Sequence, residues 1–148
     1  MKRIIHFVAL CVSCIFSLSA CLKPSIELDD TVWGDKAVIT AAVLFRYDEV
    51  TNELGYGQPV TGYQNVAVTT TVNKVDATTA TVSIVASKGT DLKKIGIRFS
   101  HFAKKIEPIG DAPPAGLISD FSKGNYVYRL YSADGTIRDW KVDISVAQ

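Results

Sequence analysis

Cys21 is the residue whose position points most directly to a chemical reaction. It follows Leu18-Ser19-Ala20, behind a basic start at Lys2 and Arg3 and an apolar run from Ile4 to Phe16. A positive start, an apolar stretch and small residues before a cleavage point are the three parts of a secretory signal. Cleavage before Cys21 would leave a thiol that can carry a thioether-linked diacylglycerol and an amine that can carry palmitate.

The tetrapeptide from Leu18 to Cys21 resembles the lipobox of bacterial lipoproteins. The resemblance implies a lipid anchor at the outer membrane, on either its surface or its periplasmic face. Two or more acyl chains hold a protein stably on a bilayer. We therefore expect a signal peptide over 1–20, a lipidated tether over 21–30 and one folded domain over 31–148. An ordinary secretory signal is the alternative, because Cys11 and Cys14 occur in the same segment.

The composition of the expected mature chain excludes several kinds of protein. Loss of the signal removes Cys11 and Cys14, so no disulfide can form within the domain. The formal net charge of the full chain is +1, and nothing in it points to nucleic acid. Basic residues gather in the middle of the chain, where Lys93, Lys94 and Lys104 are candidates for binding a protein partner. A solvated strand face is the more common explanation of such a group.

The residues that support catalysis or metal binding are few. His101 is the one histidine after the signal, so it has no second histidine or free cysteine with which to form an ordinary zinc site. It stands at an expected strand end, where a base for a serine nucleophile is improbable. Asp134 is needed by a turn, and Asp139 and Asp143 alternate with core residues, so no carboxylate pair lines a cleft. We expect no catalytic residue, metal or cofactor.

Aromatic residues in expected loops are the candidates for ligand binding. Trp33, Tyr56 and Tyr63 stand outside the strand patterns, and the Gly- and Pro-containing segment 52–62 reads as a long connection. Sugars stack on exposed aromatic rings, and binding sites often lie on loops of a rigid scaffold. The alternative is that these rings cover the open ends of the fold.

Period-two alternation of apolar residues predicts short β-strands. The runs lie at 39–47, 66–72, 80–86, 95–99, 126–132 and 140–146. In the first run, the odd positions from Ile39 to Tyr47 are expected to face inward, and in the last run the even positions from Trp140 do so. Asp134-Gly135 predicts a hairpin turn. Strands that are apolar on one face must close two sheets over a core, so we predict a single all-β sandwich of about seven antiparallel strands, with a small barrel as the second choice.

An ordered set of segments in the second half resembles a known pattern. Thr90–Ile95, Ser119–Ser122, Tyr131–Thr136 and Trp140–Ile144 follow the order of immunoglobulin/cadherin-like domains of Bacteroidetes surface lipoproteins. The resemblance covers residues 90–146 and implies a glycan-related or surface role. Trp140 stands where that family has tyrosine, and residues 31–75 match no pattern. Trp140 and Phe121 are expected in the core.

These observations favour a lipid-anchored, non-catalytic module on the outer membrane that binds glycan or takes part in surface assembly. The alternative is a protein-binding lipoprotein, such as an inhibitor, an adhesin or a fibre subunit, which would use the basic residues or an open strand edge.

Overall fold

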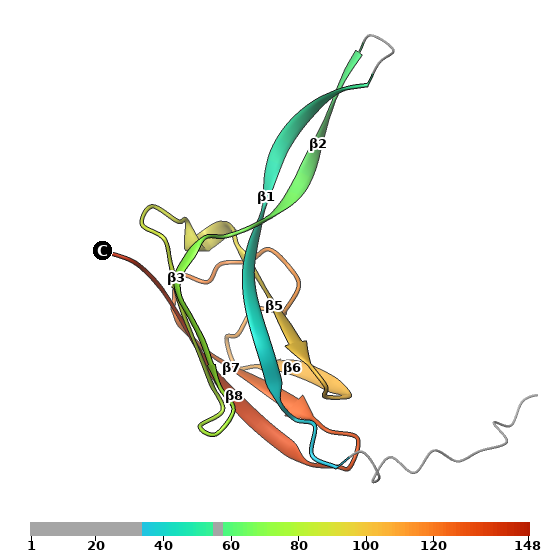
Figure 1. Ribbon diagram of the computed structural model, residues 1–148, viewed down its shortest axis with the longest axis vertical. Coiled ribbons are helices and arrows are strands. Elements are labelled where there is room, and N and C mark those ends of the chain that lie inside the picture. Colours follow the sequence, from blue (N-terminus) through green and yellow to red (C-terminus); the bar gives the residue numbers. More distant parts are fainter. Residues whose placement is uncertain (1–33, 55–57) are drawn as a thin grey trace, which may run out of the picture.

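The chain forms two β-sheets that enclose one apolar core (Figure 1). The computed structural model describes residues 34–54 and 58–148. Sheet A contains three strands in the order β2 (Gln58–Ala67), β1 (Ile39–Leu54) and β5 (Gly96–His101). Sheet B contains five strands in the order β3 (Thr70–Asp76), β4 (Thr81–Ala86), β8 (Ile137–Val146), β7 (Asn125–Tyr131) and β6 (Lys105–Ile109). The predicted all-β sandwich is confirmed.

The strand pairing differs from the prediction in two details. The described residues form eight strands where about seven were expected, and β4 pairs with β8 in parallel, with Val82 beside Val142. The other strand pairs are antiparallel. In the ranges that the structure describes, the helical structure is limited to one 3-10 turn, η3 (Leu92–Lys94).

The core is built by alternation along β4, β7 and β8, as the sequence predicts. Every second side chain of these strands is buried, and they are Val82, Ile84, Ala86, Tyr126, Tyr128, Leu130, Trp140, Val142 and Ile144. The Trp140 indole N–H donates to the carbonyl oxygen of Ala37 at 3.0 Å. Phe121 is fully buried and meets Tyr126 edge to face at 5.3 Å. The assignment of Trp140 and Phe121 to the core is confirmed.

The inward face of β1 was predicted wrongly. A register shift between Ile39 and Ala41 changes which side chains face the core, because side chains alternate strictly along a strand. Ala42 and Leu44 are buried, whereas Val43 and Tyr47 are 45% and 52% exposed. Phe45 is also buried, but it shares the outer face of the sheet with Tyr47, which it meets edge to face.

The run over 66–72 is not one strand. β2 ends at Ala67 and β3 begins at Thr70, so the chain passes from sheet A to sheet B over residues 68–69. Val68 remains attached to sheet A, since its N–H donates to the Leu44 carbonyl at 2.9 Å. Val72, in β3, is 45% exposed.

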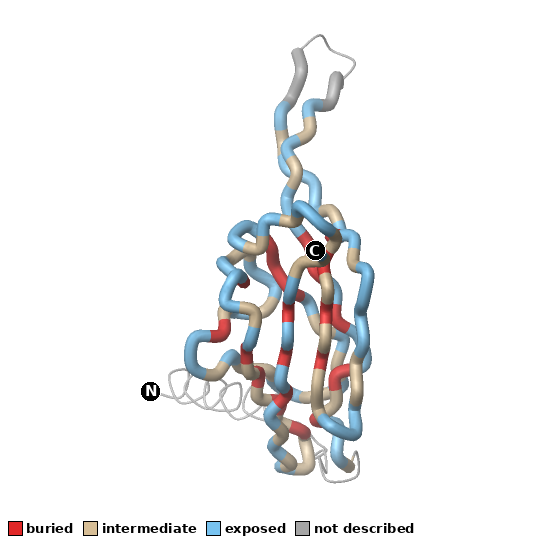
Figure 2. The backbone as a smooth tube through the Cα atoms, turned by 90° about the vertical axis from the view of Figure 1, so that its left-hand side faces the viewer, coloured by how far each residue is buried: buried red, intermediate tan, exposed pale blue. Residues whose placement is uncertain are grey.

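Most of the segment expected as a long connection is strand. β1 continues to Leu54 and β2 begins at Gln58, with an unbroken register from Phe45 opposite Ala67 to Leu54 opposite Gln58. β5 accompanies β1 only from Ile39 to Phe45. Residues 46–54 and 58–66 therefore form a two-stranded arm, which Figures 1 and 2 show projecting from the end of the sandwich.

The expected turn at Asp134-Gly135 joins β7 to β8. Gly135 has a φ of 90°, which glycine adopts without steric cost, and the Asp134 carboxylate accepts from the Thr136 N–H at 2.9 Å. Asp76 stabilises the β3–β4 turn in the same way, accepting from the N–H groups of Thr78 and Thr79 at 2.9 and 3.2 Å.

Candidate functional site

A shallow hollow of about 470 Å³ on sheet A joins two of the residues singled out from the sequence. It is lined by Tyr47, Tyr63, Lys94 and Ile118. Tyr47 lies opposite Asn65, and Glu49 lies opposite Tyr63, so the two tyrosines stand on the same face of neighbouring strands in a diagonal position. Tyr63 is 74% exposed. The hollow therefore presents two open aromatic rings at the base of the arm.

One wall of the hollow is formed by Tyr47. The ring of Tyr47 packs against Phe45, which lies beside it on the same face of the sheet. The two rings are 5.9 Å apart, edge to face, and the Arg98 guanidinium lies 4.1 Å from the centre of the Phe45 ring. Phe45 sits opposite Gly96, where an added Cβ would overlap its ring and lie 2.8 Å from the Leu117 carbonyl oxygen. Only glycine, which has no Cβ, leaves room at position 96 for the Phe45 ring.

The opposite wall comes from two segments held together by backbone hydrogen bonds. Lys94 ends η3, whose first residue follows Asp91, and the Asp91 carboxylate accepts from the Lys93 N–H at 3.0 Å. Ser119 pairs with Ile95 through an N–H···O bond of 2.8 Å, which fixes Ile118 beside the end of η3. Lys94 thus places an exposed cation at the rim of an apolar surface.

The structure brings together some predicted site residues and separates others. Tyr63 and Lys94 meet in the hollow, and Lys93 is the neighbour of Lys94. Lys104 follows the other end of β5, where its N–H donates to the Tyr131 carbonyl at 2.9 Å, so the three lysines do not form one strip. Cys21, Trp33 and Tyr56 lie outside the described residues. Tyr47 and Ile118 were missed, Tyr47 because the alternation of β1 placed it inward.

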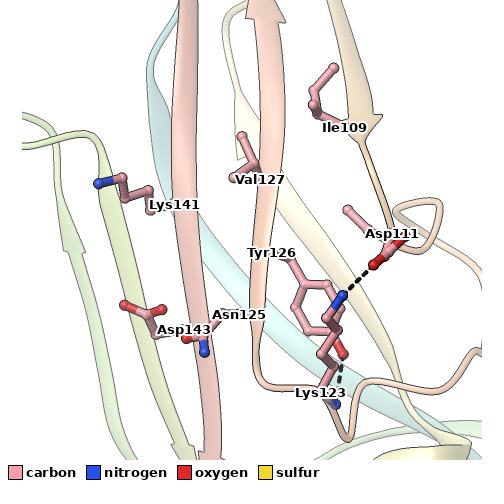
Figure 3. A pocket seen from close by; sticks show the side chains of 9 residues that line it. Ile109, Asp111, Lys123, Asn125, Tyr126, Val127, Lys141 and Asp143 are labelled. Atoms are coloured by element: carbon pink, nitrogen blue, oxygen red, sulfur yellow. Dashed lines mark hydrogen bonds and ion pairs between the residues drawn. The ribbon is translucent and has the colours of Figure 1, made fainter.

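A second hollow, of about 330 Å³, lies on the outer face of sheet B (Figure 3). Its charged residues are Asp111, Lys123, Lys141 and Asp143. Lys123 forms an ion pair with Asp111, and this hydrogen bond holds the pKa of the Asp111 carboxyl below its usual value. Figure 3 shows Lys141 and Asp143 projecting from β8, on the far side of the hollow from that pair. Both signs of charge are balanced here, so this hollow favours neither an anion nor a cation.

The titratable groups of the described residues show no arrangement for acid–base chemistry. His101 is half-buried, and its Nδ1 lies 3.2 Å from the Ala103 carbonyl oxygen. Several carboxyls have a pKa below the usual value because N–H or O–H groups donate to them, and they are Asp48, Asp76, Glu107, Asp111, Asp120, Asp134 and Asp139. A glycosidase acid needs the opposite shift. In the same part of the chain, no three His, Cys, Asp or Glu residues gather as metal ligands do.

Fold and surface together define a β-sandwich protein with an open aromatic surface and a projecting two-stranded arm. A family model described as DUF5018-related matches residues 38–143, and the chain belongs to this family. No curated protein matches the chain. Neither the description of this family nor that of a solved protein with a similar fold names a catalytic activity.

The fold is also found in a solved structure. A protein from Bacteroides fragilis NCTC 9343, provisionally described as secreted, superposes with a TM-score of 0.62 and is 16% identical. The similarity covers 76% of this chain and 97% of that one. In residues 34–54 and 58–148, no helix has the length and apolar character needed to cross a bilayer.

Proposed function

We propose that this protein is a lipid-anchored, non-catalytic binding module of the outer membrane. The sequence around Cys21 supports the anchor, and the solved neighbour, described as secreted, supports a location outside the cytoplasm. Several described carboxyls, among them Asp48 and Asp139, accept hydrogen bonds that stabilise their charged forms, which suits a surface better than a catalytic centre.

The ligand that the aromatic hollow fits best is a glycan. Tyr47 and Tyr63 present exposed rings on one face, and the C–H faces of a sugar stack on such rings. The hollow has the volume of a small-molecule site, although it is open to solvent. Lys94 at its rim can donate to a sugar hydroxyl or to the carboxylate of an acidic sugar. The pair of exposed tyrosines is the observation that carries this proposal.

Glycan arrays followed by calorimetry on the purified full chain test it. We expect Tyr47→Ala and Tyr63→Ala each to weaken binding roughly 3- to 10-fold, since one aromatic contact contributes about 0.5–1.5 kcal/mol. Phe102→Ala is the matched control, because Phe102 is 71% exposed but follows the far end of β5. Equal losses in all three variants, or turnover of any bound sugar, would contradict the proposal.

Protein binding through the basic residues is the second candidate function. Lys93 and Lys94 adjoin the hollow, so one surface could serve either ligand class. Charge reversal of both lysines, with Lys104→Glu as the control, separates the two. A protein partner lost on that reversal but retained by Tyr63→Ala would favour this alternative over sugar binding.

A further inference from the structure

The strands at the sheet edges are β2 and β5 in sheet A and β3 and β6 in sheet B. Along the arm the outer edge of β1 is also open, because β5 pairs with β1 only as far as Phe45. An edge strand exposes backbone N–H and C=O groups that can pair with another chain. Natural proteins therefore shorten, charge, bend or cover their edges. The β5, β3 and β6 edges show such protection, and the open part of β1 carries the charged residues Arg46, Asp48 and Glu49.

The β5 edge is covered by the loop that returns from sheet B. The Gly116 N–H donates to the Ile97 carbonyl at 2.7 Å, and the Ser119 N–H donates to the Ile95 carbonyl at 2.8 Å. Ser119 and Ile95 are paired as an isolated bridge. The backbone groups of this edge are thus partly occupied by the chain itself.

The two edges of sheet B carry charge and irregularity. β6 has five residues, and these include Lys105, Glu107 and Pro108. β3 contains Lys74 and Asp76, and its register shifts between Thr70 and Val72. A short charged strand with a proline and a bulged charged strand are both poor templates for pairing.

β2 has almost none of these protections. It has ten residues, its register against β1 is unbroken, and it contains no Asp, Glu, Lys or Arg. Pro59 stands near the tip, and no described strand pairs with the outer edge of β2. We call the part from Thr61 to Ala67 the β2 edge. It runs from the base of the projecting arm, where Tyr63 shares a hollow with Lys94 and Ile118, towards the tip (Figures 1 and 2).

The pairing with β1 fixes which residues direct their backbone groups outward. The Val68 N–H donates to the Leu44 carbonyl, so these two residues form a hydrogen-bonded pair. In an antiparallel ladder, hydrogen-bonded and non-hydrogen-bonded pairs alternate. Phe45 opposite Ala67 is therefore non-hydrogen-bonded, and so are the pairs of Asn65, Tyr63 and Thr61. The backbone N–H and C=O groups of these four β2 residues face away from β1.

We propose that the β2 edge pairs with the same edge of a second copy of this chain, antiparallel and centred on Tyr63. In this register Tyr63 faces Tyr63 of the second copy, and Thr61 faces its Asn65. The absence of charge on β2 is what favours a second copy, because two identical charged edges would repel each other. The two three-stranded sheets become one sheet of twice the width through an isologous contact.

The arm gains stability from this pairing. A two-stranded ribbon is only marginally stable in water by itself, and a further strand satisfies one of its open edges. This inference rests on backbone groups at the edge of the sheet and does not require sugar binding by the tyrosine rings, although Tyr63 belongs to both surfaces. The other possible occupant, an extended segment of a different protein, is an outcome of the test.

Sedimentation equilibrium of the full chain in density-matched detergent tests the proposal. We expect the wild type to dimerise, and Thr61→Lys/Asn65→Lys to weaken dimerisation at least tenfold, because each added lysine faces a lysine of the second copy. Thr61→Lys/Asn65→Asp places opposite charges face to face and should restore the dimer. Ser100→Lys/Ser145→Lys adds the same charge at exposed positions of β5 and β8 and should leave it intact.

Each outcome is decisive for the proposed contact. A wild type that stays monomeric, including one that instead binds an added strand from another protein, overturns it. A dimer that survives the double lysine substitution does so as well, because it must use another surface. Failure of Thr61→Lys/Asn65→Asp to restore the dimer overturns the register centred on Tyr63.

Discussion

Gly96 is the residue on which the outer face of sheet A most depends. The Phe45 ring and the Leu117 carbonyl occupy the space of a Cβ at this position. We expect Gly96→Ala to lower the free energy of unfolding by about 1–3 kcal/mol, the usual cost of overpacking. Urea denaturation measures it.

Gly62→Ala is the matched control for that substitution. Gly62 lies in β2, and an added Cβ there meets no atom within 4 Å, so its effect should stay within about 0.5 kcal/mol. If both substitutions changed the free energy of unfolding equally, the Phe45 ring would be able to shift at little cost, and Gly96 would have no packing role.

The same residues show what could be predicted at this scale. Trp140 was placed in the core correctly because the apolar residues of its strand share one face, and Phe121 was placed there as the large apolar residue of a polar loop segment. Val43, Leu44 and Phe45 are consecutive apolar residues, which fit either face of a strand. Phe45 is buried on the outer face only because Gly96 and Arg98 make room for it and cover it. Those two residues are some fifty positions away, so no local pattern could reveal the arrangement.

Among the structural elements, two turns contain carboxyls through which the stability responds to pH. Backbone N–H groups hold the pKa of the Asp76 and Asp134 carboxyls below their usual values. A carboxyl whose pKa is lower in the folded state stabilises the fold above its unfolded pKa, about 4, and loses this contribution as the pH falls. We expect the free energy of unfolding to decline from pH 5 towards pH 3, in part through these turns.

The double substitution Asp76→Asn/Asp134→Asn isolates that contribution. Asparagine retains an oxygen acceptor for the turn but does not titrate. Urea denaturation at several pH values should therefore show a shallower decline for this variant than for the wild type. Identical slopes would mean that other carboxyls account for the acid sensitivity.

The strands with one buried face were predicted well, whereas β1 and the 66–72 run were predicted only in part and the short edge strand β6 was missed. β4, β7 and β8 lie within sheet B, where one face is buried along the whole strand, so their alternation is regular. β1 contains a register shift, and the chain leaves sheet A at residues 68–69 while the alternation in its sequence continues. The arm was missed for a related reason. Both of its faces meet solvent, so no apolar alternation indicates strands over 48–62, and the Gly and Pro residues there suggest a loop.

At the scale of the whole molecule, the arm and the first described residues of the chain lie at opposite ends (Figure 1). The described chain begins at Gly34, near the start of β1, and β1 runs from there into the arm (Figure 1). Glu49, which faces Tyr63, lies ten residues after Ile39, or roughly 35 Å along the strand. An antiparallel pair centred on Tyr63 would therefore separate the Ile39 residues of the two copies by roughly 70 Å along the arms, with the segments that lead to the expected anchors entering at the two ends.

That separation predicts bridging between membranes. Vesicles carrying the lipidated full chain should cluster, as measured by light scattering, because one dimer can hold an anchor in each of two vesicles. The Thr61→Lys/Asn65→Lys variant should leave the vesicles dispersed, and Ser100→Lys/Ser145→Lys should cluster them like the wild type. Incorporation of labelled palmitate, lost in Cys21→Ser, verifies the anchor separately, and sedimentation verifies the dimer. If the wild type incorporated palmitate and formed the dimer but left the vesicles dispersed, bridging would be excluded. The two copies would then have to lie side by side, with both anchors in the same bilayer.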